Sequence, residues 1–219
     1  MSLRKVNFVE GEYYHIYNRG NSKKEIFHDK YDYFHFIKLM YICNNTDNIR
    51  VFNDDRCGIE VFNKAAENIV SIGAYCLMPN HFHFLITEKT EGGISKFMQK
   101  LSTAYVMYYN KKYKHTGSLF EGKFKSVHAG DDIQLKYLFS YIHLNPIKLI
   151  QKDWKERGII NKKESLNFLE DYEYSSYKDY IQKERIQKKV LNTKDFPNYF
   201  HTKEKFKDEI MEWLSFKTQ

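Results

Sequence analysis

Apolar residues recur along this chain with the two periods that distinguish strands from helices. The predicted strands are residues 13–17, 69–78, 120–127 and the apolar run that follows a turn at 79–80. The predicted helices are residues 29–42, a long amphipathic segment after the glycine pair at 92–93, and residues 131–145. The order strand, helix, hairpin, helix, strand, helix is typical of an antiparallel sheet with helices packed on one face, a ferredoxin-like α+β fold.

The pattern changes after Pro146. Charges and tyrosines are mixed over residues 148–180, and a last set of apolar residues at helical spacing should dock a final helix: Phe206, Ile210, Trp213 and Leu214. We therefore expect one domain over residues 1–150 and a basic, mainly helical C-terminal extension over residues 151–219. Residues 44–68 are polar and irregular, which is typical of an insertion before a strand.

Two histidines lie two residues apart in the apolar run that follows the turn at 79–80. Because successive side chains of a strand point to opposite faces, His81 and His83 share one face with Leu85, while Phe82 and Phe84 point to the other. One face can therefore pack on a core while the other presents two imidazoles to a metal ion. The alternative is that both histidines are hydrogen-bonded core residues.

Tyr137, Tyr141 and Asn145 are spaced four apart and lie on one stripe of the predicted helix 131–145. The stripe is either an aromatic core contact or a site for chemistry, since other residues of the helix can supply the core. Two imidazoles and an amide oxygen suit Mg²⁺ or Mn²⁺ beside a substrate phosphate. A tyrosine next to such a metal is a candidate nucleophile.

The net charge of +7 favours a phosphate backbone as partner. Cations alternate with aromatic rings over residues 111–115 and 120–125, a mixture that is typical of single-strand binding. The alternative is an exposed cationic helix end and an edge strand. The candidate DNA contacts are Arg19, Lys111, Lys112, Lys114, Lys123, Lys125 and Phe120.

Composition also bounds the class of protein. No apolar run approaches the roughly 20 residues that a bilayer span needs, so we expect a cytoplasmic protein without membrane contact. Three cysteines without a Cys-x-x-Cys pair indicate neither a disulfide framework nor a zinc knuckle.

Several blocks of the chain resemble the HUH-type single-tyrosine transposases of the insertion-sequence-200 type, and especially their REP-associated tyrosine transposase branch. HUH denotes the His-hydrophobe-His motif, here His81-Phe82-His83. The similar blocks are residues 14–20, 26–27, 31–34, 78–83, 117–125, 141–148 and 174–177. In the last block this chain has Tyr174 where the branch more usually has tryptophan.

The resemblance implies metal-dependent cleavage and rejoining of single-stranded DNA by tyrosine transesterification, as in DNA transposition, at hairpin sequences of the REP type. It implies a 5′-phosphotyrosine intermediate, with Tyr141 as nucleophile and Tyr137, one turn earlier, as its rival. His81 and His83 are the implied ligands of Mg²⁺ or Mn²⁺, and Asn145 is either the third ligand or a helix cap. His143 points away from this stripe and packs or contacts phosphate.

The resemblance also leaves alternatives open. The same fold can serve as a catalytically silent hairpin DNA-binding module, or as an HUH nickase of the replication-initiator or relaxase type. Mobile relatives work as dimers that exchange the tyrosine helix, whereas the REP-associated branch is often monomeric, so both a monomer and a homodimer fit.

Overall fold

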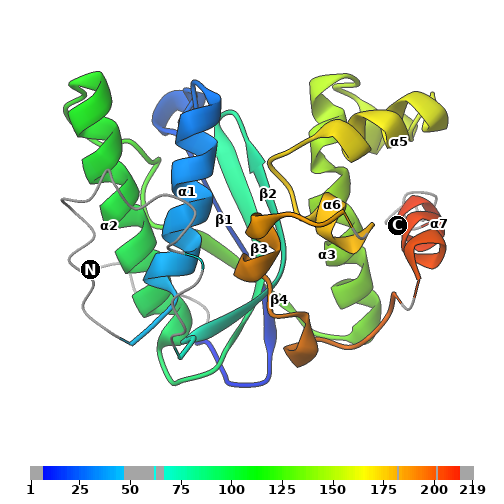
Figure 1. Ribbon diagram of the computed structural model, residues 1–219, viewed down its shortest axis with the longest axis horizontal. Helices are drawn as coiled ribbons and strands as arrows, with labels where there is room; N and C mark the ends of the chain where they lie inside the picture. The colour runs from blue at the N-terminus through cyan, green and yellow to red at the C-terminus, as the bar shows by residue number, and fades with distance from the viewer. Residues whose placement is uncertain (1–6, 47–61, 63–66, 182, 201, 213–219) are drawn as a thin grey trace.

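A four-stranded antiparallel sheet in the order β2-β3-β1-β4 forms the centre of the molecule (Figure 1). The computed structural model describes residues 7–46, 62, 67–181, 183–200 and 202–212. The strands are β1 (Tyr13–Arg19), β2 (Val70–Met78), β3 (His81–Glu88) and β4 (Lys125–Ala129). The α+β class predicted from the sequence is confirmed, and the histidine strand β3 is central, between β1 and β2.

Aspartate side chains cap the N-termini of two helices. Asp29 accepts hydrogen bonds from the backbone N–H groups of Tyr31 and Asp32, and Asp131 accepts one from Gln134. The helices are α1 (Lys30–Cys43), α2 (Gly93–Tyr113), α3 (Asp132–Leu144), α4 (Trp154–Arg157), α5 (Lys162–Asp171), α6 (Tyr177–Tyr180) and α7 (Lys203–Glu212). Short 3₁₀ turns are η1 (Asn21–Lys23), η4 (Asn145–Leu149), η5 (Ile186–Val190) and η6 (Thr193–Asp195).

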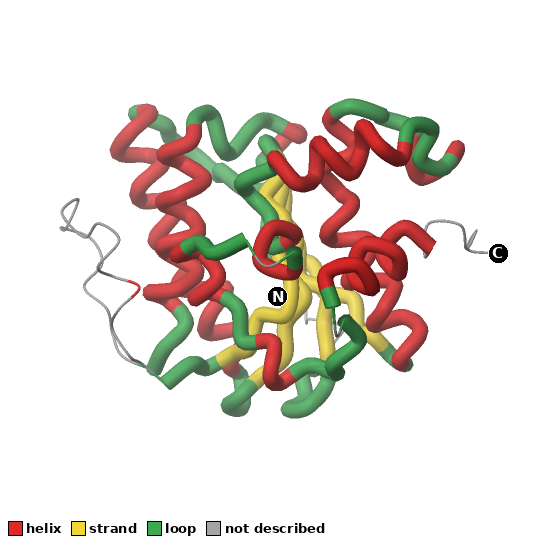
Figure 2. The backbone as a smooth tube through the Cα atoms, turned by 45° about the vertical axis from the view of Figure 1, so that its right-hand side comes forward, coloured by secondary structure: helices red, strands yellow, loops and turns green. Residues whose placement is uncertain are grey.

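Helices cover both faces of the sheet, which differs from the expectation of helices on one face (Figure 2). α1 and α2 pack on the face that carries Phe82 and Phe84, whereas α3 packs on the opposite face, against Cys76 and Leu85. The reason lies in β2, whose nine residues are all buried, so that both of its faces need an apolar cover. The second layer matters for function, because it brings α3 to the face that carries the two histidines.

The last predicted strand is shorter than residues 120–127. The regular strand β4 begins only at Lys125, and Phe120 forms an isolated bridge to Gly20. Between them, Gly122 has a φ of 139°, and its carbonyl oxygen accepts a hydrogen bond from Asn18 Nδ2. A residue in this glycine-favouring conformation interrupts the strand.

The C-terminal extension folds back on the sheet. The backbone N–H of Leu77 donates to Tyr174 O at 2.9 Å, and that of Ser176 donates to Tyr75 O at 3.0 Å, so the outer edge of β2 is paired. Phe206 and Ile210 are fully buried in a cluster with Trp154 and residues at the end of α3, as the helical spacing predicted. Trp213, Leu214 and most of the expected insertion lie outside the described residues.

None of the helices in the described ranges is long and apolar enough to cross a membrane.

Candidate active site

The register of the sheet brings three imidazoles together. Tyr17 of β1 lies opposite His83 of β3, so His15, two residues earlier in β1, points to the same face. His15 Nε2 lies 2.8 Å from His83 Nδ1, and the rings of His81 and His83 are 4.9 Å apart. His15 and His83 are both buried. The two histidines of the motif therefore belong to a cluster of three.

The imidazoles of this cluster are neutral at pH 7. Burial, reinforced by the positive charge of Lys155, lowers the pKa of His15 to about 4. Burial also lowers the pKa of His81 to about 4 and that of His83 well below its ordinary value, with Lys148 and Lys155 adding to both shifts. A neutral imidazole has a free lone pair, which is the form that binds metal ions.

Two buried nitrogen atoms of the site lack a hydrogen-bond partner. His83 Nε2 is buried without a hydrogen-bond partner. His81 Nδ1 lies 2.6 Å from Asn80 Oδ1, whose amide nitrogen donates to Lys23 O, so His81 Nδ1 carries the proton. The Asn145 side chain is hydrogen-bonded to His81, which partly offsets the fall in the pKa of His81, and Asn145 Nδ2 is buried without a partner. An unpartnered, buried imidazole nitrogen in a site that also holds an amide side chain fits a bound cation.

The residues present fit a divalent ion held by few protein ligands. The described part of the chain contains no group of three or more His, Cys, Asp or Glu side chains in a metal-binding arrangement. Such an ion would be held by His81, His83 and Asn145, with its other positions open to water or substrate oxygens. This mixed nitrogen and oxygen set suits Mg²⁺ or Mn²⁺.

Helix α3 carries the tyrosine stripe onto the imidazole cluster. The ring of Tyr141 lies edge-on to those of His83 and His15, at centroid distances of 5.6 and 5.7 Å. The ring of Tyr137 stacks on that of Tyr141 at a centroid distance of 5.9 Å. Tyr141 therefore lies between Tyr137 and the imidazole cluster. Asn145 follows one turn later, buried where η4 begins.

Tyr141 Oη has a partner from the C-terminal extension. Lys155 Nζ, at the start of α4, donates a hydrogen bond to it at 2.9 Å and lies 4.1 Å from the centre of the Tyr141 ring. Lys155 itself is exposed. The phenolic oxygen is thus next to a cation on the solvent side and close to neutral imidazoles on the sheet side.

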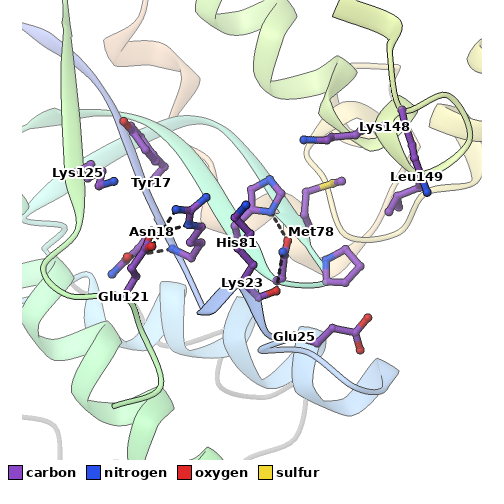
Figure 3. A pocket seen from close by; sticks show the side chains of 14 residues that line it. Tyr17, Asn18, Lys23, Glu25, Met78, His81, Glu121, Lys125, Lys148 and Leu149 are labelled. Carbon is purple, nitrogen blue, oxygen red and sulfur yellow. Dashed lines mark hydrogen bonds and ion pairs between the residues drawn. The ribbon is translucent and has the colours of Figure 1, made fainter. Parts of the chain in front are cut away.

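An open cavity of about 680 Å³ adjoins the cluster (Figure 3). His81 lies at its centre, between Lys125 on one side and Lys148 on the other. The charged side chains that line it are the cations Arg19, Lys23, Lys125, Lys148 and Lys152 and the carboxylates Glu25 and Glu121. The excess of positive charge suits a phosphate backbone.

Comparison with known proteins identifies the family. The sequence model of the family described as "Transposase IS200 like" matches residues 37–145 of this chain, a span that contains His81, His83, Tyr141 and Asn145. The chain belongs to this IS200-like transposase family. Members of the family are typically HUH tyrosine nucleases and generally use a divalent metal ion.

The fold of the IS200-like chain is also found in a solved structure, that of a REP-associated tyrosine transposase bound to a REP hairpin. The two chains superpose with a TM-score of 0.52 at 11% sequence identity, over 85% of this chain and 90% of the other. At this identity the likeness shows the fold. No curated protein sequence matches the chain.

The DNA-contact residues predicted for this IS200-like protein fall into separate groups. Arg19 and Lys125 line the cavity, where Arg19 forms two hydrogen bonds with Glu121, and Lys123 is exposed close by in sequence. A second group lies at the C-terminal end of α2, outside the cavity lining, and consists of Lys111, Lys112 and Lys114. There Lys112 pairs with Asp29 and Asp32 at 2.8 and 2.7 Å.

Phe120 and His143 are buried and do not line the cavity. The ring of Phe120 packs edge-on to Phe82, which makes it a core residue in this conformation. His143 is fully buried, with Nδ1 at 2.8 Å from Phe139 O and Nε2 at 2.7 Å from Ser176 Oγ. Of the two roles expected for His143, the structure supports packing.

The residues of this site that sequence reasoning missed include His15, Lys148, Lys152 and Lys155. His15 stands in a block that resembles the family, but its contact with His83 depends on the register of β1 against β3. The three lysines follow the tyrosine helix. Lys148 ends the block 141–148 that resembles the family, whereas only their closeness to Asn145 in sequence could have marked Lys152 and Lys155.

Proposed function

We propose that this member of the IS200-like family is a metal-dependent enzyme that cleaves and rejoins single-stranded DNA by tyrosine transesterification. The observation that carries the proposal is the contact between the rings of Tyr141 and His83. His83 Nε2 is buried without a partner, and the adjoining cavity is lined by more cations than anions. Nucleophile, metal ligands and phosphate-binding charges are thus available in one place.

In the proposed cleavage step, Tyr141 loses its phenolic proton to solvent, and Oη attacks the phosphorus of a phosphodiester. The Oη–P bond forms and the P–O3′ bond breaks, which leaves a 5′-phosphotyrosine and a free 3′-OH that has taken a proton from water. A divalent ion held by His81, His83 and Asn145 supplies Lewis-acid polarisation of the phosphate. Attack by a 3′-OH on the same linkage reverses the step and rejoins strands, so no ATP is needed.

The proposed substrate is DNA with a hairpin next to a single-stranded segment. The cations of the cavity suit the single-stranded backbone, and Arg19, Lys123 and Lys125 belong to this part of the surface. Lys111, Lys112 and Lys114 form a second basic patch, which we assign to a more distant part of the DNA. The related fold bound to a REP hairpin supports a substrate of this type.

We further propose that residues 1–150 form the catalytic domain and that the extension from residue 151 completes it. Lys155 of the extension contacts Tyr141, and residues 174–176 pair with β2. Tyr141 contacts histidines of its own chain, which supports a site that works within a monomer rather than by exchange of α3 between two chains.

The test is covalent capture of labelled hairpin oligonucleotides from the DNA that flanks the gene, read on a denaturing gel with Mn²⁺ or EDTA. We expect an adduct with wild type and Mn²⁺, none with EDTA, and none with Tyr141→Phe, although that variant still binds the hairpin. Hairpin binding without an adduct would contradict the proposed enzymatic activity and favour a DNA-binding module. Capture only at plasmid or phage origins would instead favour a replication nickase.

A further inference from the structure

Lys155 is held in place by its neighbour in the chain. Trp154 is buried in the cluster that joins Leu144 and Ile147 to the C-terminal helices, and this anchor fixes α4 beside the end of α3. The exposed Lys155 side chain then extends to Tyr141, where Nζ donates to Oη at 2.9 Å. An ammonium group has three N–H donors, so two remain for another acceptor at the same place.

The described part of the chain places further positive charge near this ammonium group and the imidazole cluster. Lys155 and Lys148 lower the pKa of both His81 and His83, Lys155 also lowers that of His15, and Arg19 lowers that of His81. The candidate metal ligands are two neutral imidazoles and a neutral amide. A divalent ion bound there would therefore add its charge to that of the nearby ammonium group, an arrangement that favours the entry of an anion.

We propose that Lys155 is a catalytic residue whose ammonium group binds a non-bridging oxygen of the scissile phosphate, between Tyr141 and the metal site. This inference rests on the proposed function. As the Oη–P bond forms and the P–O3′ bond breaks, negative charge grows on the non-bridging oxygens, and the two remaining N–H groups of Lys155 stabilise it. Lys155 neither gives nor takes a proton in this step.

In the absence of DNA, the charge of Lys155 should oppose metal binding instead of assisting catalysis. Without a phosphate, the positive charge of Lys155 repels a divalent ion at His81 and His83. Removal of that charge should then strengthen metal binding while it slows catalysis. If Lys155 merely held α4 in place, its removal would weaken metal binding and slow catalysis. The two measurements together therefore distinguish an electrostatic role of Lys155 from a structural one.

The experiment compares wild type, Lys155→Met, Lys155→Arg and the control Lys163→Met, which changes an exposed lysine of α5 in the same extension. Single-turnover capture of a hairpin oligonucleotide with Mn²⁺ gives the rate, and calorimetric titration of DNA-free protein with Mn²⁺ gives the metal affinity. We expect Lys155→Met to slow capture about 100-fold, the usual effect of losing one transition-state donor. We expect Lys155→Arg to come within about tenfold of wild type, because it restores the charge.

The affinity for Mn²⁺ should rise several-fold in Lys155→Met and stay unchanged in Lys163→Met. Wild-type capture by Lys155→Met would overturn the inference and leave the proposed function intact. Weaker Mn²⁺ binding together with slower capture in Lys155→Met would also overturn it, in favour of a structural role. Absence of an adduct with wild-type protein would overturn the proposed function, and the inference with it.

Discussion

Replacement of His15 by phenylalanine should weaken metal binding without disturbing the packing of the site. For His83 to bind a metal through its unpartnered Nε2, its proton has to be on Nδ1, and His15 Nε2, at 2.8 Å, accepts it. This hydrogen bond fixes the tautomer and the orientation of His83. Phenylalanine keeps the ring that stacks between Tyr17 and His83, at 4.9 and 5.0 Å, and removes the acceptor.

The expected loss follows from the role of such outer hydrogen bonds. Removal of the partner of a ligating histidine typically lowers metal affinity about 10- to 100-fold, or roughly 1.4–2.7 kcal/mol. The buried N–H left on His83 should also lower the free energy of unfolding by about 1–3 kcal/mol. Both effects have the same cause, so a variant that restores an acceptor should reverse both.

The assay is titration of DNA-free protein with Mn²⁺ by calorimetry at pH 7.5, at a temperature where circular dichroism shows each variant folded. His15→Gln places an amide oxygen near the position of Nε2 and should keep most of the affinity. His128→Phe is the matched control, since His128 is exposed on β4 and pairs with Glu12. Wild-type affinity in His15→Phe would refute the assigned direction of the hydrogen bond and the place of His83 in the metal site.

Three further predictions concern the nucleophile, the DNA path and pH. Tyr137→Phe should keep at least about a third of the wild-type capture rate, whereas Tyr141→Phe should lose capture entirely; equal capture by the two variants in single-turnover assays would contradict the choice of nucleophile. Lys125→Gln should weaken hairpin binding and reduce the slope of log affinity against log salt by about 1, measured by fluorescence anisotropy; an unchanged slope would remove Lys125 from the DNA path. Burial lowers the pKa of all three clustered histidines below the ordinary 6.5, and those of His15 and His81 fall to about 4. Between pH 4 and 6.5 the unfolded chain therefore binds more protons than the folded chain. The free energy of unfolding of metal-free protein should therefore fall as pH falls from 6.5 to 4, by up to about 1.4 kcal/mol per pH unit for each histidine. Urea melts that give the same free energy at pH 7.5 and 5 would contradict this cause of the pKa shifts.

The local pattern of the sequence was enough to predict the layout of the candidate site. Alternation along a strand put His81 and His83 on one face, and the spacing of four put Tyr141 and Asn145 on one helical stripe. Which strand neighbours β3, and in what register, is set by contacts between distant residues, so His15 could not be assigned. Lys155 reaches Tyr141 only because Trp154 is buried beside the end of α3.

The expectation of helices on one face was incomplete for a related reason. Apart from Ser71, residues 70–78 carry no polar side chain other than the tyrosine hydroxyl, but such a run fits a strand buried on two faces as well as one that packs on a single layer. The position of α3 decides between them. Phe120 illustrates the same limit, since an aromatic residue among lysines reads equally well as a base-stacking ring or as a core residue, and here its neighbour Phe82 makes it core.

Mass spectrometry of the covalent adduct shows which tyrosine carries the bond to DNA. Trypsin releases both tyrosines of the stripe in one peptide, residues 137–148, and fragmentation of that peptide locates the attached nucleotide. We expect a nucleotide linked through its 5′-phosphate to Tyr141 after capture of a hairpin oligonucleotide with Mn²⁺. A nucleotide on Tyr137, or on a tyrosine outside this peptide, would contradict this expectation.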